Sequence, residues 1–409
     1  MELIMGGHRI TSIPADVATR FSPNSMWNKY PLVFGGIGLV ALILAYVLGQ
    51  DHHGGQFYFS YLVAYMYGLS LALGGLFFVI VQFLVRAGWS VVVRRIAENV
   101  MGTLPLFAIL FVPVYLGLHH THHHWWGHDI SHDPLLVHKA PYLNQSFFTV
   151  RAFFYLAVWT VLSMAFLRWS TSQDRSGDHD VTRRLQWWSA PALVLFAITI
   201  TFAAVDWMKS MEPHWFSTMW GVYYFAGSVV SIFAGLSILV LWLQRDGFVR
   251  GIINEEHRHD LGKLLFGFTV FWSYIAFSQY FLIWYANLPE ETLWFEHRSH
   301  GGWQNIGAAL IVGHFFIPFF FLLPRAIKRN PTTLFLGAIW LLGIHYVDLY
   351  FVVMPVLHTK GVHFAASDLL ALVGVVSLFL GAFAYVSGRS ELVPVKDPRL
   401  PESLAFENH

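Results

Sequence analysis

The chain has 409 residues, of which 56% are hydrophobic and 12% are charged, and its mean hydropathy is +0.52. A soluble globular domain carries about twice that share of charge, so the composition predicts one polytopic membrane bundle and excludes several soluble domains. The net charge of +1 argues against nucleic acid as a partner. Because the chain has no cysteine, it cannot form disulfides, attach c-type haem covalently or ligate an iron–sulfur cluster through thiolates.

Apolar runs of about 18 residues or more predict ten transmembrane helices and therefore an all-α integral membrane fold. A polar tail at 1–30 precedes this ten-helix membrane domain at 31–388, and a second tail follows at 389–409. The predicted helices span residues 31–49, 57–85, 91–118, 147–168, 187–208, 215–244, 262–286, 302–323, 333–353 and 366–387. A polar linker is expected at 169–186, between the fourth and fifth helices.

The basic residues are divided between the two sides of the predicted membrane domain. Twenty of the 25 Lys and Arg residues fall in the two tails and in the connections after the second, fourth, sixth and eighth helices. Positive charge is retained on the cytoplasmic side of a membrane, so this division predicts a membrane protein with both tails in the cytoplasm. It also places the long 119–146 loop on the outer side. The five exceptions are Lys139, Arg151, Lys209, Arg298 and Lys360.

An internal repeat is visible in the membrane domain. The fifth and ninth helices each end with an Asp that is followed seven residues later by Pro, namely Asp206 with Pro213 and Asp348 with Pro355. The second and sixth helices both close with an Arg-x-Gly sequence, at 86–88 and 245–247. Parallel repeats of this kind occur in transport-type membrane folds. The pattern predicts two four-helix bundles, helices 2–5 and helices 6–9, flanked by helices 1 and 10.

Ionisable side chains inside a bilayer are costly, and each is therefore a candidate for function. Ordered by depth, Glu98, His314, His345, Asp348 and Asp206 form a candidate proton path, because His and carboxylates exchange protons near neutral pH. The alternative is a set of polar pairs that fix the bundle geometry, with Asp206 paired to Lys209. Secondary candidates are Asn99, Lys209, Glu212, His214, Gln279 and Asp368. No catalytic residue is predicted.

Eight of the 22 histidines lie in the loop at 119–146. Imidazoles bind zinc, copper and iron, so a metal site or a membrane oxygenase centre is one reading of the loop. The competing interpretation is a docking loop for partner proteins, which we favour because one cluster of histidines is compositional evidence only. We therefore predict no metal. His314 and His345, on different helices, leave haem b binding as a further alternative. The eight are His119, His120, His122, His123, His124, His128, His132 and His138.

Two stretches carry a family resemblance: residues 206–223, which read DWMKSMEPHWFSTMWGVY, and residues 89–96, which read WSVVVRRI. They resemble the NrfD-like, or polysulfide-reductase membrane-subunit-like, family, and within it the subunits of bacterial alternative complex III. The sister subunit of that complex, ActC, reads more like Pro-Gly-Trp-His where this chain has Glu-Pro-His-Trp. The similarity is therefore to the other NrfD-like subunit of the complex.

The resemblance implies a membrane subunit of a quinol:cytochrome c (electron acceptor) oxidoreductase in a respiratory chain of the bacterial inner membrane, with the 119–146 loop in the periplasm. It implies a scaffold with no redox centre of its own, a proton path and contact with quinone or menaquinone at residues not yet known. Haem c and iron–sulfur clusters would belong to partner subunits. The implied partners are ActC, iron–sulfur ActB, multihaem cytochrome ActA, ActD, ActE, lipids and a terminal oxidase. A stand-alone secondary transporter remains the alternative, since parallel repeats and buried charge also suit transport.

Overall fold

The computed structural model describes residues 12–50 and 55–408, and within these ranges it holds helices and no strand. Ten helical segments of the described chain are long and apolar enough to cross a membrane, which confirms the predicted all-α membrane fold. They are α1 (Tyr30–Leu48), α2 (Gln56–Leu84), α3 with α4 (Val91–Met101, Leu104–Leu116), α7 (Gln145–Ser176), α8 (His179–Trp207), α9 (Trp220–Arg245), α10 (Glu255–Ala286), α12 with η3 and α13 (Trp303–Leu310, Ile311–Phe316, Ile317–Leu322), α15 (Pro331–Val353) and α16 (Ala366–Ser387).

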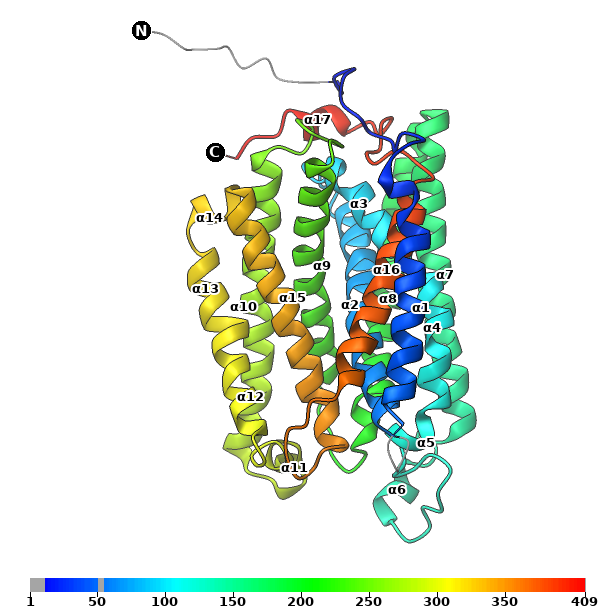
Figure 1. The fold of residues 1–409 in the computed structure, drawn as a ribbon, viewed down its shortest axis with the longest axis vertical. Coiled ribbons are helices and arrows are strands. Elements are labelled where there is room, and N and C mark those ends of the chain that lie inside the picture. Colours follow the sequence, from blue (N-terminus) through cyan, green and yellow to red (C-terminus); the bar gives the residue numbers. More distant parts are fainter. Residues whose placement is uncertain (1–11, 51–54, 409) are drawn as a thin grey trace.

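Short helices lie at the two ends of the bundle. The first described residues and the C-terminal segment with α17 lie on one face, which we call the terminal face (Figure 1). The 119–146 loop and α11 lie on the other face, which we call the opposite face. Residues 1–11 of the predicted N-terminal tail are outside the described residues. The short elements are η1 (Met26–Asn28), α5 (Leu118–Thr121), α6 (Pro134–Lys139), η2 (Lys209–Met211), α11 (Pro289–His297), α14 (Arg325–Arg329), η4 (Met354–Val356) and α17 (Leu400–Leu404).

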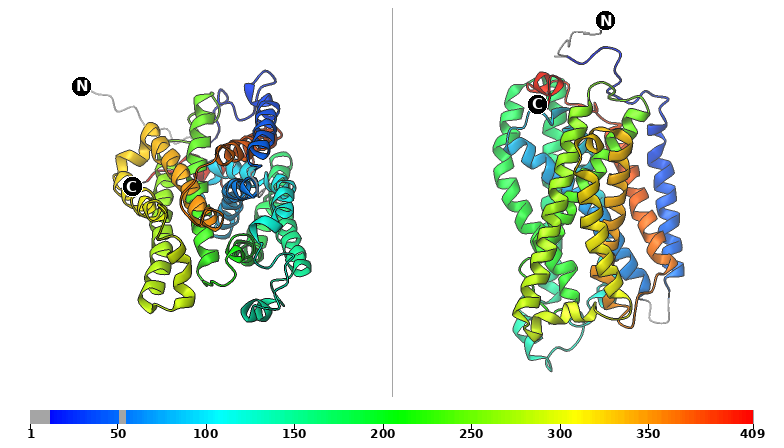
Figure 2. Two further views of the ribbon diagram at one scale, coloured as in Figure 1. Left: turned by 60° about the horizontal axis from the view of Figure 1, so that its bottom comes forward. Right: turned by 90° about the vertical axis from the view of Figure 1, so that its left-hand side faces the viewer.

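The spanning helices form the two predicted bundles. The first consists of α2, α3 with α4, α7 and α8, and the second of α9, α10, α12 with α13, and α15, while α1 packs along α16 at the side (Figure 2). The bundles meet where α2 crosses α9. Gly74 makes this crossing close, because a Cβ there would lie 2.4 Å from the Ser228 carbonyl oxygen. Small residues allow such backbone approach in lipid, where packing drives helix association.

The predicted linker at 169–186 is wrong. Helix α7 continues to Ser176 and α8 begins at His179, so only Gly177 and Asp178 separate them. Gly177 takes φ +68°, the left-handed conformation that ends a helix and that glycine adopts without a Cβ penalty. The Asp178 carboxylate then caps α8 by accepting from the Asp180 amide. Hydropathy alone missed these turns because they are helical but polar and extend past the apolar segment.

The third predicted helix, 91–118, is interrupted between Met101 and Leu104. Pro105 lies in the first turn of α4 and has no amide hydrogen, so it cannot continue the hydrogen-bond ladder of α3. The residues between keep right-handed backbone angles, and α3 and α4 therefore cross the membrane as one bent span.

The C-terminal segment is packed against the terminal face. Leu392, Val393 and Asp397 are buried, and the Leu392 amide donates to the Thr19 carbonyl. Farther along, Asn408 donates to the Asp260 carboxylate of α10 at 3.0 Å and accepts from Lys263 at 2.9 Å. Residues 391–408 thus run from the first bundle to the second, across the face where both termini lie.

Candidate functional site

A buried polar cluster lies where the two bundles meet, between α15 and α9 of the second bundle and α2 of the first. His345 and Asp348 are three residues apart on α15 and therefore share a helix face, with His345 Nδ1 4.0 Å from Asp348 Oδ2. His345 Nε2 lies 3.0 Å from Ser70 Oγ of α2, which also bonds Ser231 of α9 at 3.2 Å. The Tyr223 hydroxyl of α9 donates to the Asp348 carboxylate. The predicted pair of His345 and Asp348 is therefore part of a network that joins both bundles.

His314 faces this cluster from a distorted helix. Residues 311–316 form a π-helical segment between α12 and α13, a wide turn that is frequent at functional sites. The Trp340 indole donates to the Gly313 carbonyl at 2.7 Å, which satisfies a backbone acceptor within the distortion. The His314 ring lies 6.3 Å from the His345 ring and 3.6 Å from the Trp272 ring, centroid to centroid. Neither ring nitrogen of His314 has a hydrogen-bond partner within the described residues.

The two imidazoles of His314 and His345 are closely packed by their neighbours. Trp272 covers the His314 ring, and Gly227 of α9 brings its backbone against His345, since a Cβ there would lie 2.7 Å from His345 Cε1. His345 Nε2 is also engaged by Ser70. Close packing on both rings therefore gives no support to the haem b alternative at His314 and His345.

Asp206 lies in the first bundle, and the alternative in which it pairs with Lys209 is wrong. The Arg151 guanidinium of α7 donates to both carboxylate oxygens of Asp206, at 2.8 and 3.0 Å, and Tyr155 adds a third bond at 2.9 Å. Lys209 makes no ion pair within the described part of the chain. A bidentate arginine–carboxylate pair is the stronger arrangement, because two parallel bonds fix both partners. This buried pair ties α7 to the end of α8.

The equivalent aspartates of the two bundles therefore have different partners. Asp206 and Asp348 both lie near the opposite-face ends of their helices, and both helices lead into a 3-10 turn, η2 or η4. Asp206 is neutralised by Arg151, whereas Asp348 has no Lys or Arg partner among the described residues and contacts Tyr223 and His345 instead. A carboxylate without a fixed cation can change its protonation state at lower cost than one in an ion pair.

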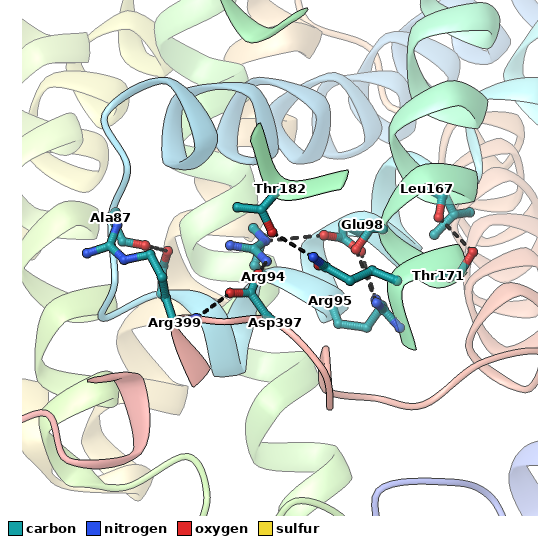
Figure 3. Close-up of polar contacts among 12 residues, drawn as sticks. Ala87, Arg94, Arg95, Glu98, Leu167, Thr171, Thr182, Asp397 and Arg399 are labelled. Carbon is teal, nitrogen blue, oxygen red and sulfur yellow. Dashed lines mark hydrogen bonds and ion pairs between the residues drawn. The ribbon is translucent and has the colours of Figure 1, made fainter. Parts of the chain in front are cut away.

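Glu98 lies in a third group, close to the terminal face. It accepts from Arg94 at 3.3 Å and from Arg95 at 2.7 Å, and Arg94 also donates to Asp397 of the C-terminal segment (Figure 3). Arg95 reaches Asp174 of α7 at 2.6 Å. No hydrogen bond in the described chain links this network to His345 or to Asp206. The predicted single ladder is thus divided into three separate groups.

Glu212 and two partners form an ion cluster on the opposite face, outside the membrane-spanning segments. Arg298 donates to Glu212 at 2.9 Å and to the backbone carbonyls of Phe351 and Val352, while His297 lies 2.9 Å from the other Glu212 oxygen. Burial opposes ionisation of Glu212, but Arg298 and His297 outweigh burial and hold its pKa below the usual value. The hydrogen bond to Glu212 raises the pKa of His297. The cluster pins α11 to the end of α15.

Three of the other secondary candidates, His214, Gln279 and Asp368, have hydrogen-bond partners on other elements. His214 bonds Asp133 in the 119–146 loop at 2.5 Å, and Gln279 accepts from Ser217 at 3.1 Å. Asp368 at the start of α16 accepts from Ser60 and Gln56 of α2, at 2.5 and 3.0 Å. Asn99 is fully buried, and neither atom of its amide has a partner in the described residues.

The histidine-rich loop shows no arrangement suited to a metal. Within residues 12–50 and 55–408, no three His, Asp or Glu side chains are grouped to hold an ion. His122 is instead buried, donating to the Asp206 carbonyl at 3.1 Å and contacting Thr121 at 2.8 Å. Burial lowers the pKa of His122 to about 3, so its ring is neutral at ordinary pH. His120 stacks on Tyr58 of α2, with ring centroids 4.8 Å apart.

Residues 206–223 connect the two bundles. At one end Asp206 pairs with Arg151 of the first bundle, and at the other Tyr223 bonds Asp348 of the second. Between them Glu212 pairs with Arg298, and the Trp215 indole donates to the Glu291 carbonyl of α11 at 2.8 Å. The side chains of residues 206–223 therefore join the two bundles on the opposite face.

Sequence reasoning missed Arg151 and Tyr223 as parts of these groups. Arg151 lies within the predicted fourth helix, so the cost of a charge in the bilayer could have marked it as the partner of Asp206. Tyr223 lies within the resemblance stretch, but no spacing rule connects it to a helix more than 100 positions later. Ser70 and Ser231 carried no signal, because serine is common at close helix contacts.

A comparison with models of known protein families gives no match for this chain. A comparison with curated proteins gives none either.

Proposed function

We propose that this chain is the ActF-type, NrfD-like membrane subunit of a bacterial alternative complex III, a quinol:cytochrome c (electron acceptor) oxidoreductase. The support is the resemblance at 206–223 and 89–96, together with the two-bundle architecture and the absence of cysteine. In this role the chain holds no redox centre, packs beside ActC and carries the cytochrome and iron–sulfur subunits ActA and ActB on its opposite face. ActD and ActE complete the assembly. Electron transfer and quinone chemistry then belong to the complex.

The same proposal assigns proton translocation to the second bundle, at His314, His345 and Asp348. The observation that carries it is the difference between the two aspartates: Asp206 is fixed by Arg151, and Asp348 has only neutral or titratable neighbours in the described chain. A proton carrier must gain and lose charge within the membrane, and this is opposed by a permanent ion pair. The Glu98 network, with two arginines and the Asp397 carboxylate, has the fixed pairing of a structural anchor.

The orientation follows from the charge division, with the terminal face in the cytoplasm and the 119–146 loop in the periplasm. Single cysteines can be placed in this cysteine-free chain. We expect Ser176→Cys, at the exposed α7 end, to resist a membrane-impermeant thiol reagent in intact cells, and His128→Cys to react. Labelling of Ser176→Cys in intact cells, with His128→Cys protected, would show that the orientation is the opposite of the one proposed.

The proton assignment is tested by paired substitutions in the reconstituted complex. Asp348→Asn keeps the shape of the side chain but cannot ionise, and Tyr223→Phe removes the hydroxyl that bonds it. Tyr224→Phe is the matched control, since it removes a neighbouring buried hydroxyl of α9 that bonds the Met66 carbonyl instead. We expect an assembled complex with retained quinol oxidation and fewer protons moved per electron in the first two variants. An unchanged proton yield in Asp348→Asn would refute the assignment.

Purification separates this function from the alternatives. Haem c and iron–sulfur subunits should co-purify with a respiratory subunit, whereas a secondary transporter should be isolated without them. The observation that favours a transporter is the π-helical segment beside buried polar residues, because helix distortions line many transport sites. A membrane oxygenase would carry stoichiometric iron at the histidine-rich loop.

A further inference from the structure

One exposed face of α8 carries basic, then aromatic, then aliphatic side chains from the terminal face inward. Near the terminal face it exposes Arg183 and Arg184, then one turn deeper Trp187 and Trp188. The positions are spaced by three and four residues, so they lie on a single side of the helix. The same side continues into the membrane with the exposed aliphatic residues Val194, Leu195 and Ile198.

The polar end of this face is hollowed. Asp180, Arg183, Arg184, Trp187 and Trp188 line an open depression of about 360 Å³. The indoles of Trp187 and Trp188 are 68% and 44% exposed and lie edge to face, with ring centroids 5.0 Å apart. Tryptophan prefers the boundary between headgroups and hydrocarbon, so these rings mark the depth at which the glycerol esters of a lipid lie.

The arginines are available to an anion. The Arg184 guanidinium lies 5.8 Å from the Trp169 ring of α7 and has no carboxylate partner within the described residues. Arg183 pairs with Asp180 at 3.0 Å, but both side chains are more than 70% exposed, at 83% and 74%. A surface pair of this kind is worth little and exchanges readily with another anion. Arg168 and Arg175, on the adjacent end of α7, add positive charge to the same region.

We propose that this face of α8 is a binding site for an anionic phospholipid. The phosphate binds Arg183 and Arg184, the glycerol region lies on Trp187 and Trp188, and one acyl chain follows Val194 and Ile198. Arginine suits this role because its planar group donates in a bidentate manner to phosphate. Juxtamembrane arginines attract anionic lipid, while the apolar continuation distinguishes a lipid from free phosphate.

The test uses the full-length protein in detergent, with bound lipid measured by native mass spectrometry. Phosphatidylglycerol is the ligand, and phosphatidylcholine and inorganic phosphate are the comparisons. We expect wild type to retain phosphatidylglycerol over phosphatidylcholine, with inorganic phosphate displacing it poorly. Arg184→Gln should weaken binding about five-fold, and the double change Arg183→Gln with Arg184→Gln about twenty-five-fold.

Two further variants make the result specific. Asp180→Asn removes the competing carboxylate and should strengthen phosphatidylglycerol binding, an effect that a purely structural role for α8 would not produce. Arg245→Gln removes an exposed arginine at the end of α9, a helix that contributes no residue to the lining of the depression, and should leave binding unchanged. Equal losses in Arg245→Gln and Arg184→Gln would overturn the proposal in favour of general surface charge. Equal retention of both lipids, or full displacement by inorganic phosphate, would also overturn it.

Discussion

The contact between the two bundles depends on Gly74, and Gly74→Ala tests it. The new Cβ would lie 2.4 Å from the Ser228 carbonyl oxygen and 2.7 Å from Ile232 Cβ. Ordinary contact needs about 3.5 Å, so α2 and α9 would have to separate locally by about 1 Å. Neither obstacle is the flexible end of a side chain, and the strain must therefore be taken up by the helices themselves.

The expected cost of Gly74→Ala follows from two opposing effects. Overpacking a filled interior costs about 1–3 kcal/mol, whereas replacing glycine by alanine within a helix stabilises by about 0.5–1 kcal/mol. Gly267 on α10 is the matched control, because a Cβ there meets nothing within 4 Å. Gly267→Ala should show the helix benefit alone. The difference in unfolding free energy between the two variants should therefore be about 1–3 kcal/mol.

The difference is measured by equilibrium unfolding of the purified protein in mixed detergent and SDS, followed by tryptophan fluorescence. A second readout is functional, because Ser70, one turn from Gly74 on α2, holds His345 at 3.0 Å. Separation of the helices should loosen that bond and reduce proton yield in the reconstituted complex. If Gly74→Ala unfolds at the same or a higher SDS fraction than Gly267→Ala, the close crossing of α2 and α9 is refuted.

Three other outcomes follow from the polar groups. Arg151→Met leaves the Asp206 carboxylate buried without its cation and should lower the unfolding free energy by about 3–5 kcal/mol in the same assay. The hydrogen bond to Glu212 raises the pKa of His297 above its ordinary value of 6.5. The bond therefore stabilises the folded protein fully below pH 6.5, and this stabilisation is lost as pH rises through the raised pKa. The unfolding midpoint of wild type should fall over that range, and His297→Gln should remove this fall; a parallel profile in both proteins would contradict it. His122→Ala should cost about 2 kcal/mol through a cavity and a lost bond to the Asp206 carbonyl, and an unchanged midpoint would show that the loop is not anchored there.

Helix positions could be predicted from the sequence wherever apolar length decided them. All ten spans were found, because a bilayer requires about 20 apolar residues in each crossing and the chain has no other way to satisfy its backbone there. The helix ends were missed where helices extend beyond the apolar segment, as α7 does to Ser176. Capping and helix propensity determine such ends, and hydropathy carries no information about them. The bend before Pro105 was also missed, although proline carries that signal.

For the candidate site, the sequence predicted only which ionisable residues would be energetically expensive to bury in the membrane. The default that ionisable groups in membranes are functional selected Glu98, Asp206, His314, His345 and Asp348, all of which are buried. The same rule could not tell which of these groups is held in an ion pair and which is not, because that depends on the neighbouring side chains. The pairs that decide this, such as Arg151 with Asp206, are 55 residues apart.

The sequence by itself determined the class of protein, the number of spans, the division into two bundles and the residues whose burial is expensive. The class, the spans and the residues that are expensive to bury follow from local composition and period, which every stretch of chain carries within itself. The division into two bundles follows from the internal repeat, which compares two segments of the same chain. Only the tertiary structure decided which aspartate is locked by arginine and which contacts histidine and tyrosine, and that Glu98 is tied to the C-terminal segment. Those outcomes depend on which side chains meet across helices, and the energy of a buried charge is set by atoms a few ångströms away in space.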